Sequence, residues 1–230
     1  GLSLLKNIIK SSIDAQGFTK SRNIRQLIFY LKYLIIIREW FKESQNIIPE
    51  YIDENIYYLG SSYAFIWQNI KQDIFFNGNY LSDNKEFDLY LKRLSYTFKN
   101  EINELGGYAI LKNKKIILAA DIGSSPNKKF SSDYQAGALS FEIFSNDKKL
   151  ISNAGYYSDK NNKFNKLSKS SAVHCALTIE DHSSCNFIKV HKNLFISKGL
   201  KVIKKNVVFE NNYWKISGAH DGYAIKFETN

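Results

Sequence analysis

The hydrophobic spacing of this 230-residue chain changes once, at Gly106-Gly107, from the period of a helix to the period of a strand. Before that point, residues such as Leu27, Leu31 and Leu34 follow the i, i+4, i+7 spacing of one buried helix face. After it, short apolar or alternating runs follow one another with no helical segment between them. We therefore predict an α+β protein with a helical domain over residues 1–105 and an antiparallel β-sandwich domain over residues 106–230.

The predicted elements follow from the same spacing and from turn residues. Three helices are expected, around residues 27–41, 53–72 and 84–105, with breaks at Pro49 and at Asn77-Gly78-Asn79. The predicted strands are Tyr108–Leu111, Lys115–Ala120, Ala138–Phe144, Leu150–Ile151, Phe187–Val190, Leu194–Ser197, Leu200–Phe209, Tyr213–Ser217 and Tyr223–Phe227.

Composition excludes several classes of protein. Hydrophobic residues make up 44% of the chain, enough for a core. The longest apolar run, Leu27–Phe41, contains three charged residues and is too short to span a bilayer, so we predict no integral membrane segment.

Cys175 and Cys185 are too few for a disulfide framework, and we expect buried thiols. Because residue 1 is Gly and the end follows a strand-like run, we expect a piece of a longer protein.

The net charge of +10 does not by itself identify a partner. The 32 cationic residues are nearly all lysines scattered along the chain, whereas nucleic-acid sites usually cluster arginine. We therefore expect no nucleic-acid partner. A positive surface would equally attract an acidic polysaccharide.

All four histidines lie in the strand-rich part: His174, His182, His191 and His220. His174 stands in the densest polar stretch, residues 170–182, where it could act as a general base, shield a carboxylate or bind a metal. The alternative is a half-buried histidine bonded to a backbone carbonyl, which spacing alone favours. His220 and Asp221 alternate across a strand, so a turn at Asp221-Gly222 is favoured over a catalytic pair.

Four segments in order resemble the heparinase II/III-like family of polysaccharide lyases, as a diverged, proteobacterial-type member. Three of them, residues 133–142, 150–156 and 170–177, are similar to its β-domain, and Ala219–Tyr223 follows at the proper distance. Upstream, Gly17–Asn23 and the helices after it resemble the last part of the family's helical toroid. The resemblance covers nearly the whole chain.

The resemblance implies the C-terminal part of an (α/α) toroid followed by an antiparallel β-sandwich, with a glycan cleft between them. It also implies cleavage of uronate-containing polysaccharides by β-elimination. In that reaction a base removes the proton next to the carboxylate, another group neutralises the carboxylate, and a third helps the leaving oxygen depart. A periplasmic or envelope location is likewise implied.

The chain departs from the family pattern at several positions. Asp133 and Gln135 stand where the family has two histidines, and Asn153 stands where it has a zinc-binding aspartate. His174 is kept as the one matching zinc ligand, and since amide oxygens bind zinc weakly, we expect no zinc site. The family's catalytic tyrosine falls at Gln26.

These correspondences define the candidate site. We predict catalytic roles for His174, Asp133 and Gln26, and glycan-binding roles for Gln135, Asn153, Arg22, Asn23 and His220. The first hypothesis is a lyase, or a diverged relative, acting on an acidic glycan. The second is a non-catalytic glycan-binding or envelope-assembly protein on the same fold. Sequence leaves the oligomeric state open.

Overall fold

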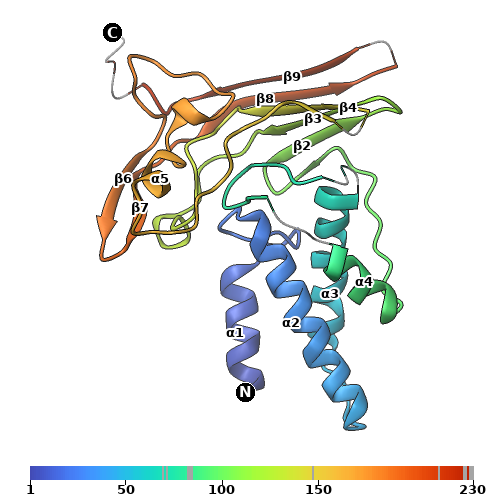
Figure 1. Ribbon diagram of the computed structural model, residues 1–230. Coiled ribbons are helices and arrows are strands. Elements are labelled where there is room, and N and C mark those ends of the chain that lie inside the picture. Colours follow the sequence, from blue (N-terminus) through green and yellow to red (C-terminus); the bar gives the residue numbers. More distant parts are fainter. Residues whose placement is uncertain are drawn as a thin grey trace.

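The computed structural model describes residues 1–68, 70, 72–81, 85–146, 148–211, 213–224 and 227. Helices extend from one face of an antiparallel sheet, and a long β-hairpin covers the opposite face (Figure 1). The predicted α+β fold with antiparallel sheets is therefore confirmed. The helices are α1 (Leu2–Ser12), α2 (Ile24–Glu43), α3 (Glu50–Tyr63), which continues into a π-helical stretch (Ala64–Gln68), α4 (Lys85–Arg93) and α5 (Lys163–Leu167).

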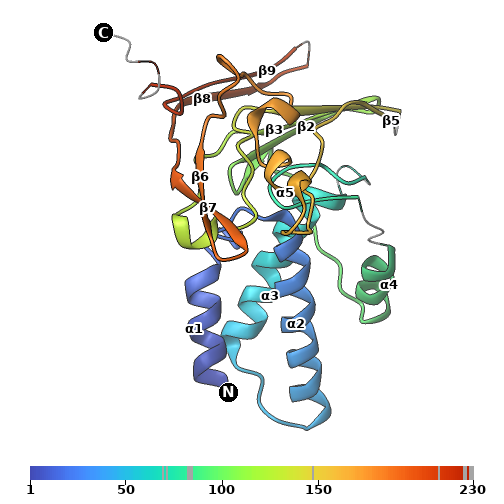
Figure 2. The same cartoon turned by 60° about the vertical axis from the view of Figure 1, so that its left-hand side comes forward.

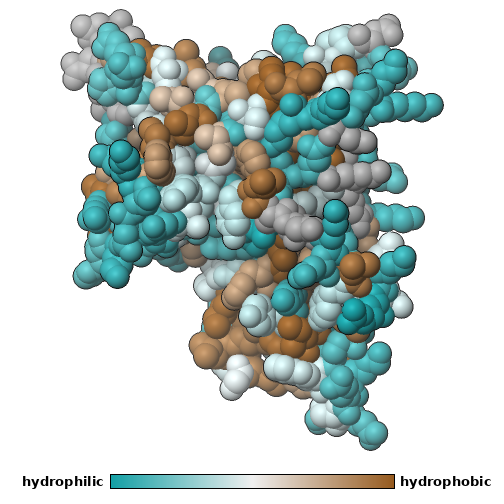
Figure 3. All heavy atoms as spheres, viewed as in Figure 1, coloured by the Kyte–Doolittle hydropathy of each residue, from teal (hydrophilic) through white to brown (hydrophobic). Residues whose placement is uncertain are grey.

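Helices α1, α2 and α3 lie side by side beneath the sheet in both ribbon views (Figures 1 and 2). The predicted helix face of α2 is buried, with Leu27 and Leu31 fully inaccessible to solvent. Asn23 caps this helix, because its side chain accepts a hydrogen bond from the backbone of Gln26. Figure 3 shows hydrophobic residues on part of the helical surface. Leu4 of α1 and Trp40 of α2 are large side chains that are exposed.

Helix α4 is shorter than predicted. The spacing of apolar residues suggested a helix as far as residue 105, but the chain leaves the helix after Arg93 and is extended before β1. Ser95 adopts φ +61°, and the backbone N–H groups of Ser95 and Tyr96 donate to the carbonyls of Lys92 and Leu91. This is the Schellman motif, which usually has glycine at the left-handed position and here has serine.

The strands form one five-stranded sheet and two hairpins, all antiparallel. The sheet runs in the order β1-β2-β3-β4-β5, and the hairpins are β6-β7 and β8-β9. The strands are β1 (Glu104–Leu105), β2 (Tyr108–Lys112), β3 (Ile116–Asp121), β4 (Phe141–Ser145), β5 (Lys148–Ile151), β6 (Asn186–Val190), β7 (Asn193–Lys198), β8 (Val202–Phe209) and β9 (Trp214–His220).

Several predicted strand boundaries differ from the observed ones: β8 begins at Val202 rather than at Leu200, and β9 continues to His220 rather than ending at Ser217. The strand expected from Ala138 begins at Phe141, because Leu139 takes φ +61° in the preceding turn. Tyr223 and Ala224, expected in a strand, lie in a turn, while residues 225 and 226 fall outside the described residues.

Strand β2 is buried on both faces, which explains its continuous apolar run. Tyr108 and Ile110 point into the core shared with the helices, whereas Ala109 packs with Ala120 against Val207 of the β8-β9 hairpin. The small alanines sit directly opposite each other in the register, so the hairpin can approach closely. The helices and the sheet therefore share one hydrophobic core.

Among the described residues, no helix combines the length and the apolar composition needed to cross a bilayer.

Candidate functional site at the helix–sheet junction

Arg22 fastens the start of α2 to the sheet. It adopts φ +58°, and its guanidinium, only 9% exposed, forms a 2.6 Å ion pair with Asp121 at the end of β3. Its remaining N–H groups donate over 2.8–3.3 Å to the carbonyls of Gly106, Gly107, Gly123 and Ser124. A Cβ at Gly123 would lie 2.5 Å from the guanidinium carbon, so glycine leaves the space that Arg22 fills. The Arg22 side chain is thus engaged in holding the junction.

Asn77 makes a second connection across the junction. Its Nδ2 donates to Asp121 Oδ2 over 2.8 Å and to the Tyr108 hydroxyl over 2.7 Å. The Tyr108 hydroxyl in turn donates to the carbonyl of Arg22 over 2.6 Å. Burial raises the pKa of Tyr108, so this hydroxyl keeps its proton. The network holds the residues that follow Arg22 in a fixed position.

Asp133 carries a partly exposed carboxylate at the junction, with its side chain 22% exposed. Asn23 Nδ2, from the helical part, donates to Asp133 Oδ2 over 3.1 Å. The Tyr156 hydroxyl, from the sheet part, donates to Oδ1 over 3.0 Å, and Lys160 Nζ lies 3.8 Å from the same oxygen. Burial, and then the Asp133 charge, raise the pKa of Tyr156, so its phenol is protonated. The carboxylate is therefore surrounded by an amide, a phenol and an ammonium group.

Gln26 lies one turn beyond Asn23 on α2. Its Oε1 accepts a 2.6 Å hydrogen bond from the Ser21 hydroxyl, and its backbone N–H donates to Asn23 Oδ1 over 3.3 Å. This side chain supports the helix start from which Asn23 reaches Asp133.

Gln135 and His174 meet at one backbone oxygen, the carbonyl of Ser168. Gln135 is buried, and its Nε2 lies 2.6 Å from that oxygen, while His174 Nε2 lies 3.2 Å from it. Because a carbonyl only accepts hydrogen bonds, this contact places the imidazole proton on Nε2. Burial lowers the pKa of His174 to about 4, and the bond to Ser168 opposes that shift only in part. The ring is therefore neutral at neutral pH.

Asn153 and His220 have other neighbours. Asn153 Oδ1 accepts from the backbone N–H of Cys175 over 2.8 Å, and its own N–H donates to the buried carboxylate of Glu142. His220 ends β9, where its Nδ1 accepts from Gly222 and its ring packs beside Tyr223. The structure thus brings Asn23 and Asp133 together and joins Gln135 to His174 through the Ser168 carbonyl. The hydrogen bonds of the Asn153 and His220 side chains go to other residues.

The zinc site implied by the family does not fit these side chains. Within the described part of the chain, no three His, Cys, Asp or Glu side chains are grouped closely enough to hold a metal ion. His174 Nε2 faces a carbonyl oxygen, and both amide atoms of Gln135 are already hydrogen-bonded. Zinc requires several N, S or carboxylate donors converging on one point, and the junction does not offer them.

Two junction residues have no signal of their own in the sequence, Lys160 and Lys169, and Tyr156 ends the matched segment 150–156 without a predicted role. Lys169 is 1% exposed, and its Nζ donates to the carbonyls of Ser132 and Tyr134, on either side of Asp133. Burial lowers its pKa to about 8, and the Asp133 charge opposes that shift. The residues between Gly155 and Lys169 read as a polar loop, and only the fold returns them to Asp133.

Comparisons with known proteins agree with this architecture. The model of the heparinase II/III-like C-terminal domain matches residues 104–230. The crystal structure of heparan sulfate lyase HepC from Pedobacter heparinus is 15% identical, with a TM-score of 0.67 over 96% of this chain and 37% of that enzyme. The heparinase III BT4657 gene product is 12% identical, with a TM-score of 0.68 over 94% of this chain and 36% of that protein.

The chain thus spans little more than a third of the length of these solved proteins, and at such low identity the structural likeness shows the fold alone. No curated protein sequence matches it. The family match covers more than half of the chain, and the resemblance noted from the motifs is confirmed. The chain belongs to the heparinase II/III-like family and carries its C-terminal domain.

Proposed function

We propose that the protein containing this chain binds acidic, uronate-containing glycans at the helix–sheet junction and cleaves them by β-elimination. In this proposal, α1 to α4 form the closing part of an (α/α) toroid, and the sandwich domain begins near residue 106. The observation that carries the proposal is the partly open Asp133 carboxylate, bonded from the helical part by Asn23 and from the sheet part by Tyr156.

In the proposed reaction, Asp133 acts as the base and Tyr156 as the acid. The Asp133 carboxylate takes the proton from the sugar carbon next to the uronate carboxylate, and that electron pair forms a carbon–carbon double bond. The bond to the glycosidic oxygen breaks, and the leaving oxygen takes the phenolic proton of Tyr156. Lys160 and the amide of Asn23 provide positive charge and a donor for the uronate carboxylate. Solvent proton exchange restores both groups.

The remaining candidate residues have supporting roles in this proposal. Gln26 fixes the start of α2, while Gln135 and neutral His174 hold the Ser168 carbonyl and with it the segment after Tyr156. Arg22 holds the junction closed from the other side. Asn153 positions the loop that leads into Tyr156, and His220 the end of β9.

β-Elimination leaves an unsaturated sugar that absorbs ultraviolet light, which gives a direct test. We expect the full-length protein to raise this absorbance with a uronate polysaccharide, in a panel that begins with heparan sulfate and heparin. Asp133→Asn and Tyr156→Phe should each lower the rate by about 100-fold, since each removes a proton-transfer group. Tyr213→Phe, a substitution on the exposed β8-β9 hairpin, should leave it unchanged. Product formation that survives both junction substitutions would contradict this assignment.

Non-catalytic glycan binding is the second candidate, and two observations favour it. His174 is neutral and bonded to Ser168, and the position of the family tyrosine holds Gln26, which is bonded to Ser21. Saturable binding of the same glycans without any unsaturated product would establish this alternative. His174→Ala should then weaken glycan binding through loss of the Ser168 contact.

A further inference from the structure

A shallow groove of about 190 Å³ opens beside the junction, between the Tyr156–Tyr157 segment and α5. Its apolar lining is unusually open to solvent: Tyr157 is 42% exposed, Phe164 48% and Leu167 49%. The rings of Tyr157 and Phe164 lie 5.7 Å apart at 60°. Exposed aromatic rings in a concave position are typical of binding sites.

The groove is held in shape by buried polar contacts. Asn165, 3% exposed, donates to the carbonyl of Tyr157 over 2.5 Å and to the Tyr156 hydroxyl over 3.2 Å. The Tyr157 N–H donates to the Ser168 hydroxyl over 3.2 Å. The backbone of Tyr157 is therefore fixed on both sides, and a ligand would meet a surface already in its binding shape.

The surroundings of the groove are cationic. Residues 154–168 contain three exposed lysines, Lys160, Lys163 and Lys166, against one acidic residue, Asp159. Lys163 and Lys166 are exposed, and the Lys163 ammonium lies 5.7 Å from the centre of the Phe164 ring. An anionic ligand lying on the rings would thus meet positive charge at its edges.

Tyr156 connects the groove with the junction. It lines the groove and donates its hydroxyl proton to Asp133, and the Lys160 ammonium lies 3.8 Å from the same carboxylate. One residue therefore belongs both to the groove and to the groups around Asp133.

We propose that this groove is a subsite for one sugar residue of an acidic glycan, next to the residue held at Asp133. The apolar face of the sugar ring packs on Tyr157 and Phe164, and its carboxylate or sulfate groups face Lys163 and Lys166. The proposal rests on the proposed function for its ligand class and adds a second contact site to it.

The test measures binding of heparan sulfate oligosaccharides to the full-length Asp133→Asn protein by titration calorimetry, so that turnover does not consume the ligand. Tyr157→Ala and Phe164→Ala should each weaken binding about tenfold, since each removes an aromatic contact. The double substitution Lys163→Gln and Lys166→Gln should weaken binding and reduce its dependence on salt.

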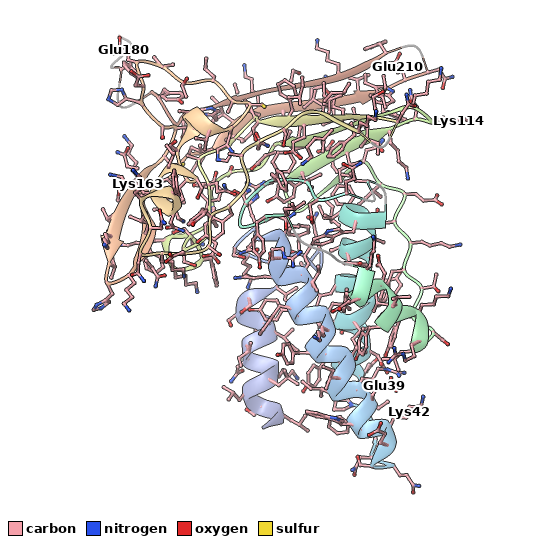
Figure 4. All side chains as sticks on the ribbon, in the orientation of Figure 1. Glu39, Lys42, Lys114, Lys163, Glu180 and Glu210 are labelled. Carbon is pink, nitrogen blue, oxygen red and sulfur yellow. The ribbon has the colours of Figure 1, made fainter. Side chains whose placement is uncertain are left out.

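Matched controls lie on the opposite side of the molecule. Figure 4 shows Lys163 and Glu210 at opposite ends, and the Tyr213 hydroxyl contacts Glu210. Tyr213→Ala and Lys215→Gln therefore remove an exposed aromatic and an exposed lysine far from the groove, and both should bind as the parent does. All these positions are exposed, so circular dichroism should show unchanged folding.

The outcomes separate the subsite from the proposed function. Loss of affinity in the groove variants alone supports the subsite, whether or not the wild-type protein forms product. Parent-like affinity in Tyr157→Ala and Phe164→Ala overturns the subsite and leaves the proposed function standing. No glycan binding, with phosphatidylserine vesicles bound through Phe164 instead, overturns both and assigns the groove to a lipid surface.

Discussion

Burial of the His174 imidazole keeps this side chain in its neutral form. Burial lowers its pKa to about 4, against an ordinary value of 6.5. Between these two pH values the unfolded chain binds a proton at this position and the folded chain does not. Neutral His174 therefore makes its full contribution to the free energy of unfolding above pH 6.5, and this contribution decreases as the pH falls to 4.

The decrease in stability between pH 6.5 and 4 can be measured by urea unfolding. The urea midpoint of the wild-type protein should fall between pH 6.5 and 4, and His174→Gln should fall less steeply, because glutamine keeps an N–H donor for Ser168 but does not titrate. His191→Gln changes an exposed histidine and should keep the wild-type slope. Equal slopes in His174→Gln and the wild type would show that this imidazole is protonated in the folded state.

For single residues, the sequence could identify some side chains of the candidate site but not all of the residues that contact them. The resemblance placed Asn23 and Asp133 in one site although they are 110 residues apart, and they share a hydrogen bond. It gave Tyr156 no role, although this residue ends the matched segment 150–156, and Lys160 lies outside the matched segments. The bond between His174 and Ser168 is the structural alternative that spacing alone favoured.

The end of α4 shows how a short element can depend on one unfavourable residue. Ser95 holds the left-handed conformation, which costs a non-glycine residue roughly 1 kcal/mol. We therefore expect Ser95→Gly to raise the free energy of unfolding in urea by about 0.5–1 kcal/mol. Lys92→Gly, one residue before the helix end, should lower it by about 1 kcal/mol. A loss of stability in Ser95→Gly would mean that the Ser95 side chain contributes more than its strained backbone costs.

The same element explains the difference between the predicted and the observed helices. The apolar residues from Phe87 to Phe98 continue to suit a helix after Arg93, and no glycine or proline marks the true end. Phe98 instead packs in the core over Gly60 of α3, where a Cβ would lie 2.1 Å from the ring. Tertiary packing therefore decides where this helix ends, whereas the change of period at Gly106-Gly107 is a local signal and could be read directly.

For the molecule as a whole, the junction decides whether the candidate site exists, because Asn23 and Asp133 come from the two sides that Arg22 joins. Removing one partner of a buried ion pair costs more than the pair contributes, since the other charge stays buried. The planar Arg22 guanidinium hydrogen-bonds to Asp121 and to four carbonyls at once, and a lysine ammonium cannot reproduce that geometry.

Arg22→Lys should accordingly lower the free energy of unfolding by about 3 kcal/mol, and Gly123→Ala should also destabilise, because its Cβ would lie 2.5 Å from the guanidinium carbon. Arg93→Lys, an exposed arginine at the end of α4, should change stability by less than about 0.5 kcal/mol.

Trp40 and Trp67 report on the helices and Trp214 on the sheet hairpin, so fluorescence-detected urea unfolding follows both sides. Because the helices and the sheet share one core, the wild-type transition should be single, and near-wild-type stability of Arg22→Lys would mean that this core alone holds the junction together.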